Sequence, residues 1–223
     1  MSWAQHHEAG PAAAFHERDP EPGAGRGLWW FEVDGPTLVL GSTQPESTVD
    51  ARAAQREGVA VVRRRSGGGA VHLEPGGASW VDVVIPRHDP LWEGDVSRAF
   101  LWLGDAWAAA LGEIGVEAEV HRGALEATAW TRLVCFAGLG PGEVTTAAGE
   151  GRRKVVGISQ RRTRTHTRFQ CVVHHRFDPW DTVGLLALPE AEGHDLAAAL
   201  AAGVATVPAG PEALRAALLV ALP

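Results

Sequence analysis

A run of three glycines, placed directly after a cluster of arginines, constrains this chain more than any other feature. It follows a short apolar stretch at residues 59–62 and three arginines at 63–65, and it reads Ser66, Gly67, Gly68, Gly69, Ala70 and Val71. Residues without a Cβ atom let backbone N–H groups approach a ligand closely, and guanidinium groups bind phosphate or carboxylate oxygens in pairs. The spacing matches neither the P-loop nor the dinucleotide-binding fingerprint. The pattern predicts an anion-binding turn after a strand; the alternative is a flexible turn with solvated arginines.

Lys154 is the second informative residue, because it is the only lysine among 20 basic side chains. Arginine stands at every other basic position, so a position that keeps an ammonium group is expected to need one. An ammonium is a compact point charge that can release its proton, whereas a guanidinium is planar and stays charged. Lys154 is therefore a candidate catalytic residue, with a chance surface lysine as the alternative.

These two motifs belong to a longer series of segments at residues 41–44, 64–71, 135–136, 142–144 and 154–161. Residues 64–71 resemble the R-x-S-G-G-G-A-V signature of lipoate-protein ligases, and residues 154–161 resemble their K-[IV]-x-G-[ST]-[AS]-x-R segment. The other segments are similar to the early G-x-x-Q of that family and to the stretch that precedes its lysine. Two long motifs in the family's order are far more specific than either alone.

The resemblance implies the fold of the biotin and lipoate ligase superfamily. This is a mixed α/β (α+β) architecture with a largely antiparallel sheet and helices mainly on one side. It also implies an enzyme that uses ATP and magnesium to activate lipoate or octanoate as the acyl-adenylate. The acyl group then passes to a lysine of a lipoyl domain, in a 2-oxoacid dehydrogenase or glycine cleavage protein.

The resemblance also assigns roles to particular residues. Lys154 would be catalytic, bridging the acyl carbonyl and the α-phosphate. Residues 37–41 and 71–76 would line the slot for the acyl chain, although their apolar side chains are also typical of a core. The residues that would bind substrate or adenylate are Arg64, Ser66, Gly67, Gly68, Gly69, Ala70, Val71 and Arg161.

Cys135 supports an alternative chemistry. Octanoyltransferases with the same core use a cysteine in a similar segment to take the acyl group from an acyl carrier protein as a thioester, and a thiolate near arginine or lysine is activated for that step. A buried structural cysteine is the other interpretation. The Ser66-Gly67-Gly68-Gly69 order favours the ligase, because the cysteine-dependent relatives more often carry T-G-G-R-A-V.

Two departures from the family keep a third hypothesis open, a non-catalytic protein that binds an acyl group or adenylate. Residues 73–77 lack the amide side chain of the usual H-D-x-G-N, and Cys171-Val172 replaces an expected H-G pair. The chain after about residue 178 is also short for the accessory domain of full-length ligases.

Composition limits the partners and the compartment. A formal charge of −7 argues against general nucleic-acid binding. Two cysteines provide no disulfide framework, and the N-terminus has no apolar signal core, so the cytoplasm is expected. The apolar stretch at 196–207 is too short to span a membrane.

The basic run at 161–168 would suit the acidic surface of a lipoyl domain or an acyl carrier protein, and a solvated loop is the alternative. We assign no metal site, because the adjacent His174 and His175 would point to opposite faces of a strand.

A composition rich in Pro, Gly and charge predicts a loosely packed lead over residues 1–26. The resemblance implies a single catalytic domain over 27–223 that ends in Ala-rich helices without a full accessory domain. Asp95 could cap a helix that runs to about Ile114. A turn at 34–36 predicts a hairpin between its flanking strands. The expected strands are residues 28–33, 37–40, 59–62, 79–86, 133–136, 143–144, 153–161 and 167–174, with a turn at 149–151, and the expected final helices are 194–203 and 211–222.

Overall fold

The computed structural model describes residues 2–146 and 151–223. Its main element is a seven-stranded sheet in the order β1-β2-β6-β10-β9-β8-β7, in which only β1 and β2 pair in parallel. The strands are β1 (Ala4–Gly10), β2 (Gly27–Val33), β6 (Ala78–Pro86), β7 (Ala118–Val120), β8 (Val144–Thr146), β9 (Lys154–Arg162) and β10 (His166–His174). The mixed, largely antiparallel sheet predicted from the sequence is confirmed.

A second, three-stranded sheet lies beside the first. Its order is β4-β3-β5, and it contains β3 (Thr37–Leu40), β4 (Ala60–Arg63) and β5 (Val71–Leu73). The predicted hairpin between β2 and β3 is therefore wrong, because the two strands lie in different sheets. Both edges of β2 are taken by β1 and β6, and both edges of β3 by β4 and β5. The Asp34-Gly35-Pro36 turn reverses the chain without pairing its flanks.

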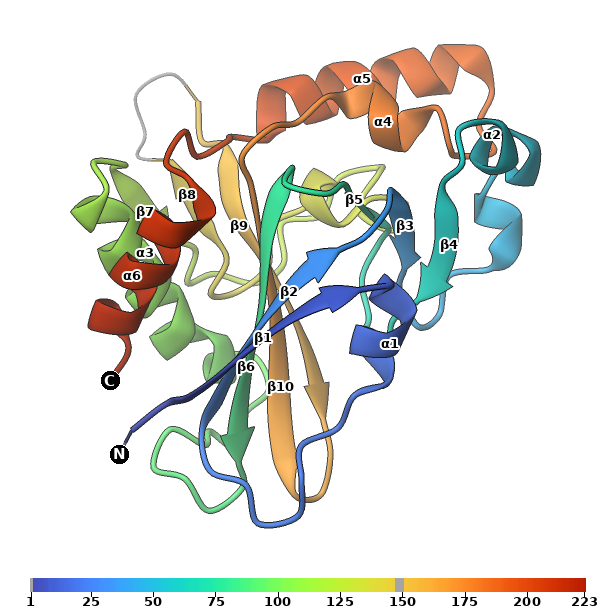
Figure 1. The fold of residues 1–223 in the computed structure, drawn as a ribbon. Helices are drawn as coiled ribbons and strands as arrows, with labels where there is room; N and C mark the ends of the chain where they lie inside the picture. Colours follow the sequence, from blue (N-terminus) through green and yellow to red (C-terminus); the bar gives the residue numbers. More distant parts are fainter. Residues whose placement is uncertain (1, 147–150) are drawn as a thin grey trace.

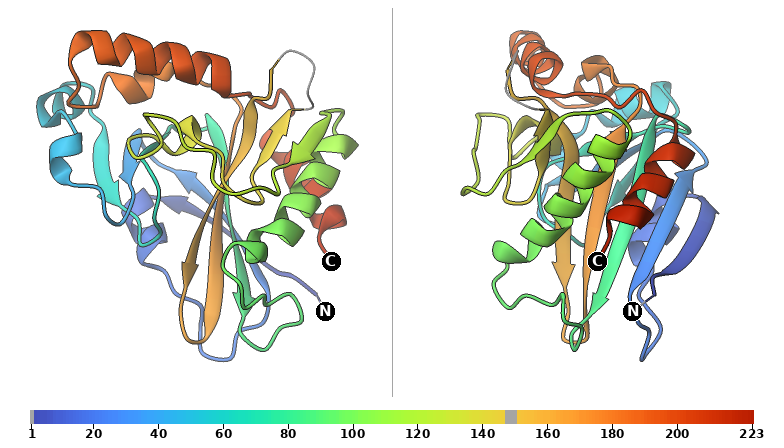
Figure 2. Two further views of the ribbon diagram at one scale, coloured as in Figure 1. Left: turned by 180° about the vertical axis from the view of Figure 1, so that it is seen from behind. Right: turned by 90° about the vertical axis from the view of Figure 1, so that its left-hand side faces the viewer.

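Two helices, α3 and α6, cover one face of the large sheet. The helices are α1 (Ala12–Glu17), α2 (Ala51–Arg56), α3 (Leu101–Glu113), α4 (Pro179–Val183), α5 (Glu190–Gly203) and α6 (Pro211–Ala221). Figure 1 and Figure 2 show α3 and α6 side by side on that face, while α5 crosses the end of the molecule above the small sheet. No helix within residues 2–146 and 151–223 is long and apolar enough to cross a membrane.

Three apolar clusters fill the spaces between these layers. The largest lies between the sheet and the α3 and α6 pair, where Trp107 and Leu103 are fully buried. A second cluster joins β3 to α5, and a third lies between the opposite face of the large sheet, α1 and the small sheet. The small sheet and α1 thus occupy the face that α3 and α6 leave open.

The helix predicted from Asp95 begins later than expected. Asp95 accepts hydrogen bonds from the backbone N–H groups of Ser97 (2.8 Å) and Arg98 (3.1 Å), and so caps a 3-10 turn over Arg98–Phe100. The α-helix follows at Leu101. The two predicted C-terminal helices correspond to α5 and α6.

Two stretches differ from the sequence expectation. Residues 4–17, predicted to be loosely packed, form β1 and α1, and the Phe15 side chain is buried against Phe31 and Trp80. The strand predicted at 133–136 is instead a bridge between Val134 and Ala70, followed by a 3-10 turn over Cys135–Ala137. Two residues of the predicted turn, 149 and 150, lie outside the described residues.

Candidate active site

Lys154 opens β9 and is held as a buried ammonium, with only 4% of the residue exposed. Its Nζ lies 2.7 Å from Oε2 of Glu143 and donates to the backbone carbonyls of Cys135 (2.9 Å) and Gly138 (3.0 Å). An ammonium has three N–H donors, so these three oxygens match its full capacity. The side chain is fixed in position by its neighbours.

Glu143 is the partner that holds this charge. Besides the ion pair, its Oε2 accepts from the backbone N–H of Gly140 (2.7 Å), and its Oε1 accepts from the backbone N–H of Ile158 (2.9 Å). The carboxylate therefore ties the loop before β8 to β9. The sequence indicates Glu143 only as part of a motif and gives no sign of its pairing with Lys154.

The glycine run forms a tight loop pressed between two other segments. Gly68 has φ +99°, which disfavours residues with a side chain. A Cβ atom on Gly69 would lie 2.6 Å from the backbone of Val134, and one on Gly41 would lie 1.9 Å from the carbonyl oxygen of Gly68. The loop needs glycine because backbone passes backbone there, beside Cys135.

Arg64 supports this loop from beneath. Its Nη2 donates to the carbonyls of Gly67 and Gly69, both at 2.8 Å, and the residue is 4% exposed. Burial lowers the pKa of this guanidinium, and attraction to the Cys135 thiolate opposes that lowering. The sequence predicts that Arg64 binds an anion directly. In this structure its donors bind the loop itself.

Ser66 joins the loop to the large sheet. Its hydroxyl donates to the Gln170 side-chain oxygen (2.7 Å) and lies 3.0 Å from the Ser159 hydroxyl. These contacts fix the start of the glycine loop to β9 and β10. Among the described residues, the backbone N–H groups of Gly67, Gly68 and Gly69 donate to no protein acceptor, and Gly67 and Gly68 are exposed whereas Gly69 is buried.

The loop, Lys154 and Cys135 surround one cavity of about 310 Å³. Its lining joins β9 to the segment after the 3-10 turn. The lining residues are Gly67, Gly68, Gly69, Val96, Phe100, Leu125, Thr131, Cys135, Gly138, Gly140, Pro141, Glu143, Lys154, Ile158, Ser159 and Gln160. The structure therefore brings together the two candidate catalytic residues and the three glycines.

A narrow apolar slot of about 30 Å³ lies next to this cavity. Val39, Val71, Leu73, Trp80 and Val172 supply much of its apolar wall. Cys135 and Ser159 line both spaces. The slot thus contains side chains from the two segments that the sequence resemblance assigns to an acyl chain, and Cys135 lies where slot and cavity meet.

Other predicted residues lie apart from this cavity. Ala70 is fully buried behind the loop, where its N–H donates to the carbonyl of Leu133 (2.8 Å). Arg161 does not line the cavity, and it pairs with Asp19 (2.9 Å), which also binds Arg65. The structure does not bring Arg161 to Lys154.

The basic run at 161–168 is mostly engaged inside the protein. Arg162 donates to the carbonyls of Glu93 (2.7 Å) and Gly94 (2.8 Å), and Arg168 is 2% exposed and paired with Asp82. Among the four arginines of this run, only Arg164 is exposed. The run is therefore not the open basic patch that the sequence suggests.

Comparisons with known proteins agree with this arrangement. Residues 14–207 match the family described as lipoyl protein ligase A/B catalytic domain. The octanoyltransferase LipM of Moorella thermoacetica is 34% identical over 139 residues, which cover 60% of this chain and 48% of that relative. The chain thus matches about half the length of this curated relative.

Solved structures share the fold. The bipartite lipoate protein ligase from Thermoplasma acidophilum, studied with its E2 lipoyl domain, has a TM-score of 0.77 and 18% identity, with 99% of this chain and 82% of that chain covered. A lipoate-protein ligase A bound with ATP has a TM-score of 0.74 and 17% identity, covering 99% and 84%. The match of family and fold over nearly the whole described length identifies the chain as a member of the lipoyl protein ligase A/B catalytic domain family.

Proposed function

We propose that this protein is an octanoyltransferase, which moves an octanoyl group from an acyl carrier protein to a lysine of a lipoyl domain through a thioester on Cys135. The observation that carries this proposal is the position of Cys135 between the larger cavity and the narrow apolar slot. An acyl chain would have to widen this slot of about 30 Å³, and it would then bring its carbonyl carbon to the mouth of the slot, beside Cys135. The lysine of the lipoyl domain would enter through the cavity.

The charges around the cavity favour a thioester over a nucleotide triphosphate. Lys154 is the only lysine or arginine among the cavity-lining residues, and Glu143 already compensates its charge. The guanidinium of Arg64 donates its hydrogen bonds to carbonyl groups of the loop. A triphosphate requires strong cationic or metal compensation, whereas an acyl thioester is uncharged at its reacting atoms. These contacts favour the transferase over the ligase that the order of the glycine motif predicts.

The proposed reaction has two balanced steps. The Cys135 thiolate attacks the thioester carbonyl of the acyl carrier protein, a new sulfur–carbon bond forms, and the carrier leaves as a thiolate that takes up a proton. The lysine amine of the lipoyl domain then attacks the Cys135 thioester. An amide bond forms, the amine loses a proton, and Cys135 is released as the thiolate.

Two groups are suited to stabilising the oxyanion that forms in each step. The unpaired N–H groups of the exposed Gly67 and Gly68 are candidate donors, in a loop held by Arg64 from beneath. The Lys154 ammonium donates to the backbone carbonyl of Cys135, and because its three donors bind protein oxygens, it would act on the oxyanion as a nearby fixed charge. The similarity to an octanoyltransferase supports this assignment of roles.

Substrates and partners follow from this reaction. We propose lipoyl domains of 2-oxoacid dehydrogenases or glycine cleavage proteins as acceptors and an acyl carrier protein as donor, with the cytoplasm as the compartment where they meet. The bipartite ligase of T. acidophilum was studied with its own E2 lipoyl domain, which supports an acceptor of this type.

The decisive experiment compares two cysteine variants. Cys135→Ala should abolish transfer from octanoyl carrier protein to a lipoyl domain, and the wild type incubated with the donor alone should gain one hydroxylamine-sensitive octanoyl group by intact mass. Cys171→Ala is the matched control, because Cys171 is fully buried in the core and burial raises the pKa of its thiol. Transfer that survives in Cys135→Ala would contradict the thioester mechanism.

An ATP-dependent ligase is the second candidate. The unpaired N–H groups of the glycine loop favour it, since such groups also bind phosphate oxygens. Under this alternative, ATP, magnesium and octanoate would yield AMP and an octanoylated lipoyl domain, with Cys135→Ala still active. Neither product in either assay would instead support a non-catalytic binding protein.

A further inference from the structure

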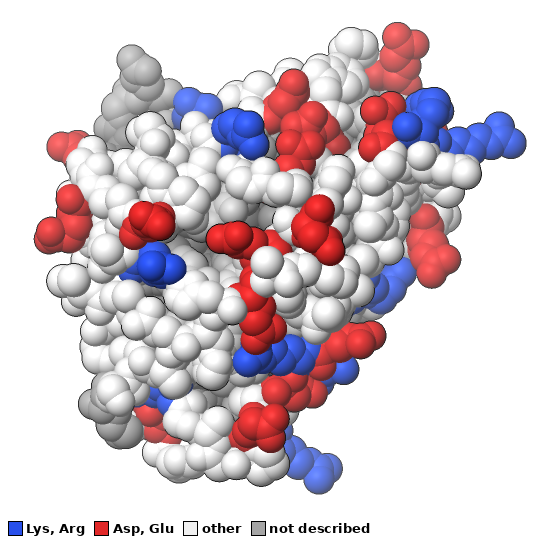
Figure 3. Space-filling model, viewed as in Figure 1, with Lys and Arg blue, Asp and Glu red and all other residues white. Residues whose placement is uncertain are grey.

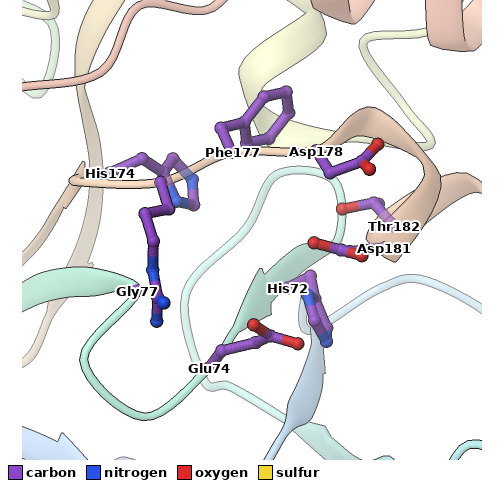
Figure 4. Close-up of a pocket in the computed structure, with 9 residues that line it drawn as sticks. His72, Glu74, Gly77, His174, Phe177, Asp178, Asp181 and Thr182 are labelled. Carbon is purple, nitrogen blue, oxygen red and sulfur yellow. The ribbon is translucent and has the colours of Figure 1, made fainter.

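A second cavity lies on the opposite side of β5 from the acyl slot. Successive side chains of a strand point to opposite faces, so Val71 and Leu73 line the slot while His72 lines this other space. The second cavity has a volume of about 280 Å³. Its lining, shown in Figure 4, consists of His72, Glu74, Gly77, His174, Arg176, Phe177, Asp178, Asp181 and Thr182.

Three side chains with metal-ligating groups meet in this cavity. One ligand atom from each of His72, Glu74 and Asp181 lies within 4.8 Å of the other two. His72 belongs to β5 and Glu74 follows it, whereas Asp181 comes from α4, more than a hundred residues later. Figure 4 shows the His72 ring close to both carboxylate groups. Only the fold unites them.

The His72 ring has an unmet hydrogen-bonding requirement. Its residue is 9% exposed, and Nε2 is buried without a partner among the described residues. A buried polar atom with no partner destabilises the folded state. An imidazole with one unpaired nitrogen, in a residue whose ring lies near two carboxylates, is suited to take a further ligand.

The charge around the ring points to the sign of that ligand. Asp178 also lines the cavity, so three carboxylates face it, and the one lining cation is the exposed Arg176. Arg176 directs its guanidinium to the carbonyl of Pro75 at 3.4 Å. The crowding of negative charge favours a cation.

We propose that His72, Glu74 and Asp181 bind a divalent transition metal such as Zn²⁺ or Mn²⁺. One imidazole nitrogen and two carboxylates are a donor set typical of these ions, whereas Ca²⁺ and Mg²⁺ prefer oxygen alone. Ligand atoms around such an ion lie about 3.3 Å apart, so small side-chain rotations from the observed separations close the site. The sequence gives no sign of it, because its ligands are dispersed over the chain.

The bound metal would join β5 to α4. Because β5 also supplies Val71 and Leu73 to the acyl slot, the metal would fix the strand that forms the wall of that slot. Its effect on stability is therefore measurable in the absence of any substrate.

The test uses the full chain freed of metal by chelation and titrated with Zn²⁺ or Co²⁺. We expect one ion per chain, a Co²⁺ absorption band that reports a nitrogen ligand, and a higher melting temperature with Zn²⁺. His72→Ala and Asp181→Asn should each weaken binding at least tenfold. Asp181 is exposed, so that variant does not disturb the core.

His194→Ala is the matched control. His194 is an exposed histidine whose Nε2 lies 4.0 Å from the Glu190 carboxylate on α5, so it presents a similar pair of groups without a cavity. Its removal should leave the affinity unchanged. The proposal is overturned if the wild type binds no ion stoichiometrically, or if His72→Ala and Asp181→Asn bind as tightly as the wild type.

Discussion

Among single residues, Lys154 differs from a surface lysine in that each of its N–H donors meets an oxygen at 2.7 to 3.0 Å. Holding the ammonium in one place removes the reorganisation that a mobile side chain would need when charge develops on a substrate. Burying the ammonium costs desolvation free energy, and the ion pair with Glu143 offsets that cost. The pair is therefore a fixed electrostatic element of the cavity.

We expect Lys154→Arg to lower the transfer rate at least about 100-fold, the size of effect that follows the loss of one preorganised electrostatic group of an active site. The guanidinium is planar and longer, so it cannot occupy a site shaped by three oxygens around one nitrogen. Steady-state kinetics should show the loss in kcat more than in KM. Arg153→Lys, a change of the same type at the exposed neighbouring position, is the control. A fully active Lys154→Arg protein would remove Lys154 from the mechanism.

His174 predicts how stability depends on pH. Burial, with the nearby positive charges of His72, His175 and Lys154, lowers its pKa from 6.5 to about 3. The unfolded chain therefore binds a proton between pH 6.5 and 3 that the folded chain does not. The contribution of His174 to the free energy of unfolding is therefore complete above pH 6.5, and it falls by about 1.4 kcal/mol for each pH unit below that. His16, whose pKa burial also lowers to about 3, acts in the same direction.

Urea unfolding measures this dependence. Between pH 6.5 and 5.0, His174→Gln should lose about 2 kcal/mol less stability than the wild type. His194→Gln, at an exposed position, should lose as much as the wild type. Parallel losses in His174→Gln and the wild type would contradict the assignment.

The sequence indicates the chemical groups of the site but not their orientation. Lys154, Cys135 and the three glycines were all predictable, because their types and spacing resemble a known motif. The direction of Arg64 was not, since an arginine that binds a phosphate and one that binds loop carbonyls look alike in a sequence. The pairing of Glu143 with Lys154 depends on a contact between β9 and the loop before β8 that no local pattern encodes.

Among the secondary-structure elements, α1 depends on one buried ion pair. Arg168 on β10 donates to the carbonyls of Phe15 (2.5 Å) and Arg18 (2.6 Å) at the C-terminal end of α1, and its Nε donates to the fully buried Asp82 on β6. The guanidinium thus satisfies carbonyl groups that a helix leaves without partners at its end. It attaches the N-terminal segment to the middle of the large sheet.

Arg168→Met should lower the free energy of unfolding by about 3 to 5 kcal/mol, because Asp82 is left as an unpaired buried charge. The double change Arg168→Met with Asp82→Leu should recover most of that loss, since no buried charge remains. Arg164→Met, in the turn before β10, should have little effect because Arg164 is exposed. A double variant no more stable than Arg168→Met in urea unfolding would show that the charge is not the cause.

Strands and helices with clear periodicity were predictable, and pairing between them was not. The β6 segment is apolar over most of its nine residues and β10 alternates at Phe169, Cys171 and Val173, which are strong strand signals, whereas β9 is apolar only in its first half. Residues 133–136 carry the same kind of signal over four residues. They turn instead, because Val134 bridges Ala70 and the chain must then bend around Lys154. The lead at 4–17 was missed because the burial of Phe15 depends on a distant Trp80.

Across the whole molecule, negative charge predominates. The formal charge is −7, and Figure 3 shows acidic side chains spread over the face seen in Figure 1. Three of the arginines in the run at 161–168 are engaged with carbonyl or carboxylate groups of the protein. Long-range attraction to an acidic carrier or lipoyl domain is therefore weak.

We expect the kcat/KM for an acidic lipoyl domain not to fall when sodium chloride rises from about 50 to 300 mM, and to increase by up to about threefold. Salt screens repulsion between two acidic proteins over distances beyond roughly 10 Å. Stopped-time assays at constant pH across this range measure the effect. A steep decrease with salt would indicate an attractive basic surface.

The two cysteines differ in exposure, so one of them can be labelled selectively. Cys135 is partly exposed at the meeting point of slot and cavity, whereas Cys171 is sealed in the core. A mild alkylating reagent should therefore modify the native chain once, at Cys135, which peptide mapping would locate. Pre-incubation with an acyl donor should block that modification. A fluorophore or covalent inhibitor could thus be attached at the centre of the site with no engineered residue, and the fluorophore would report its occupancy directly.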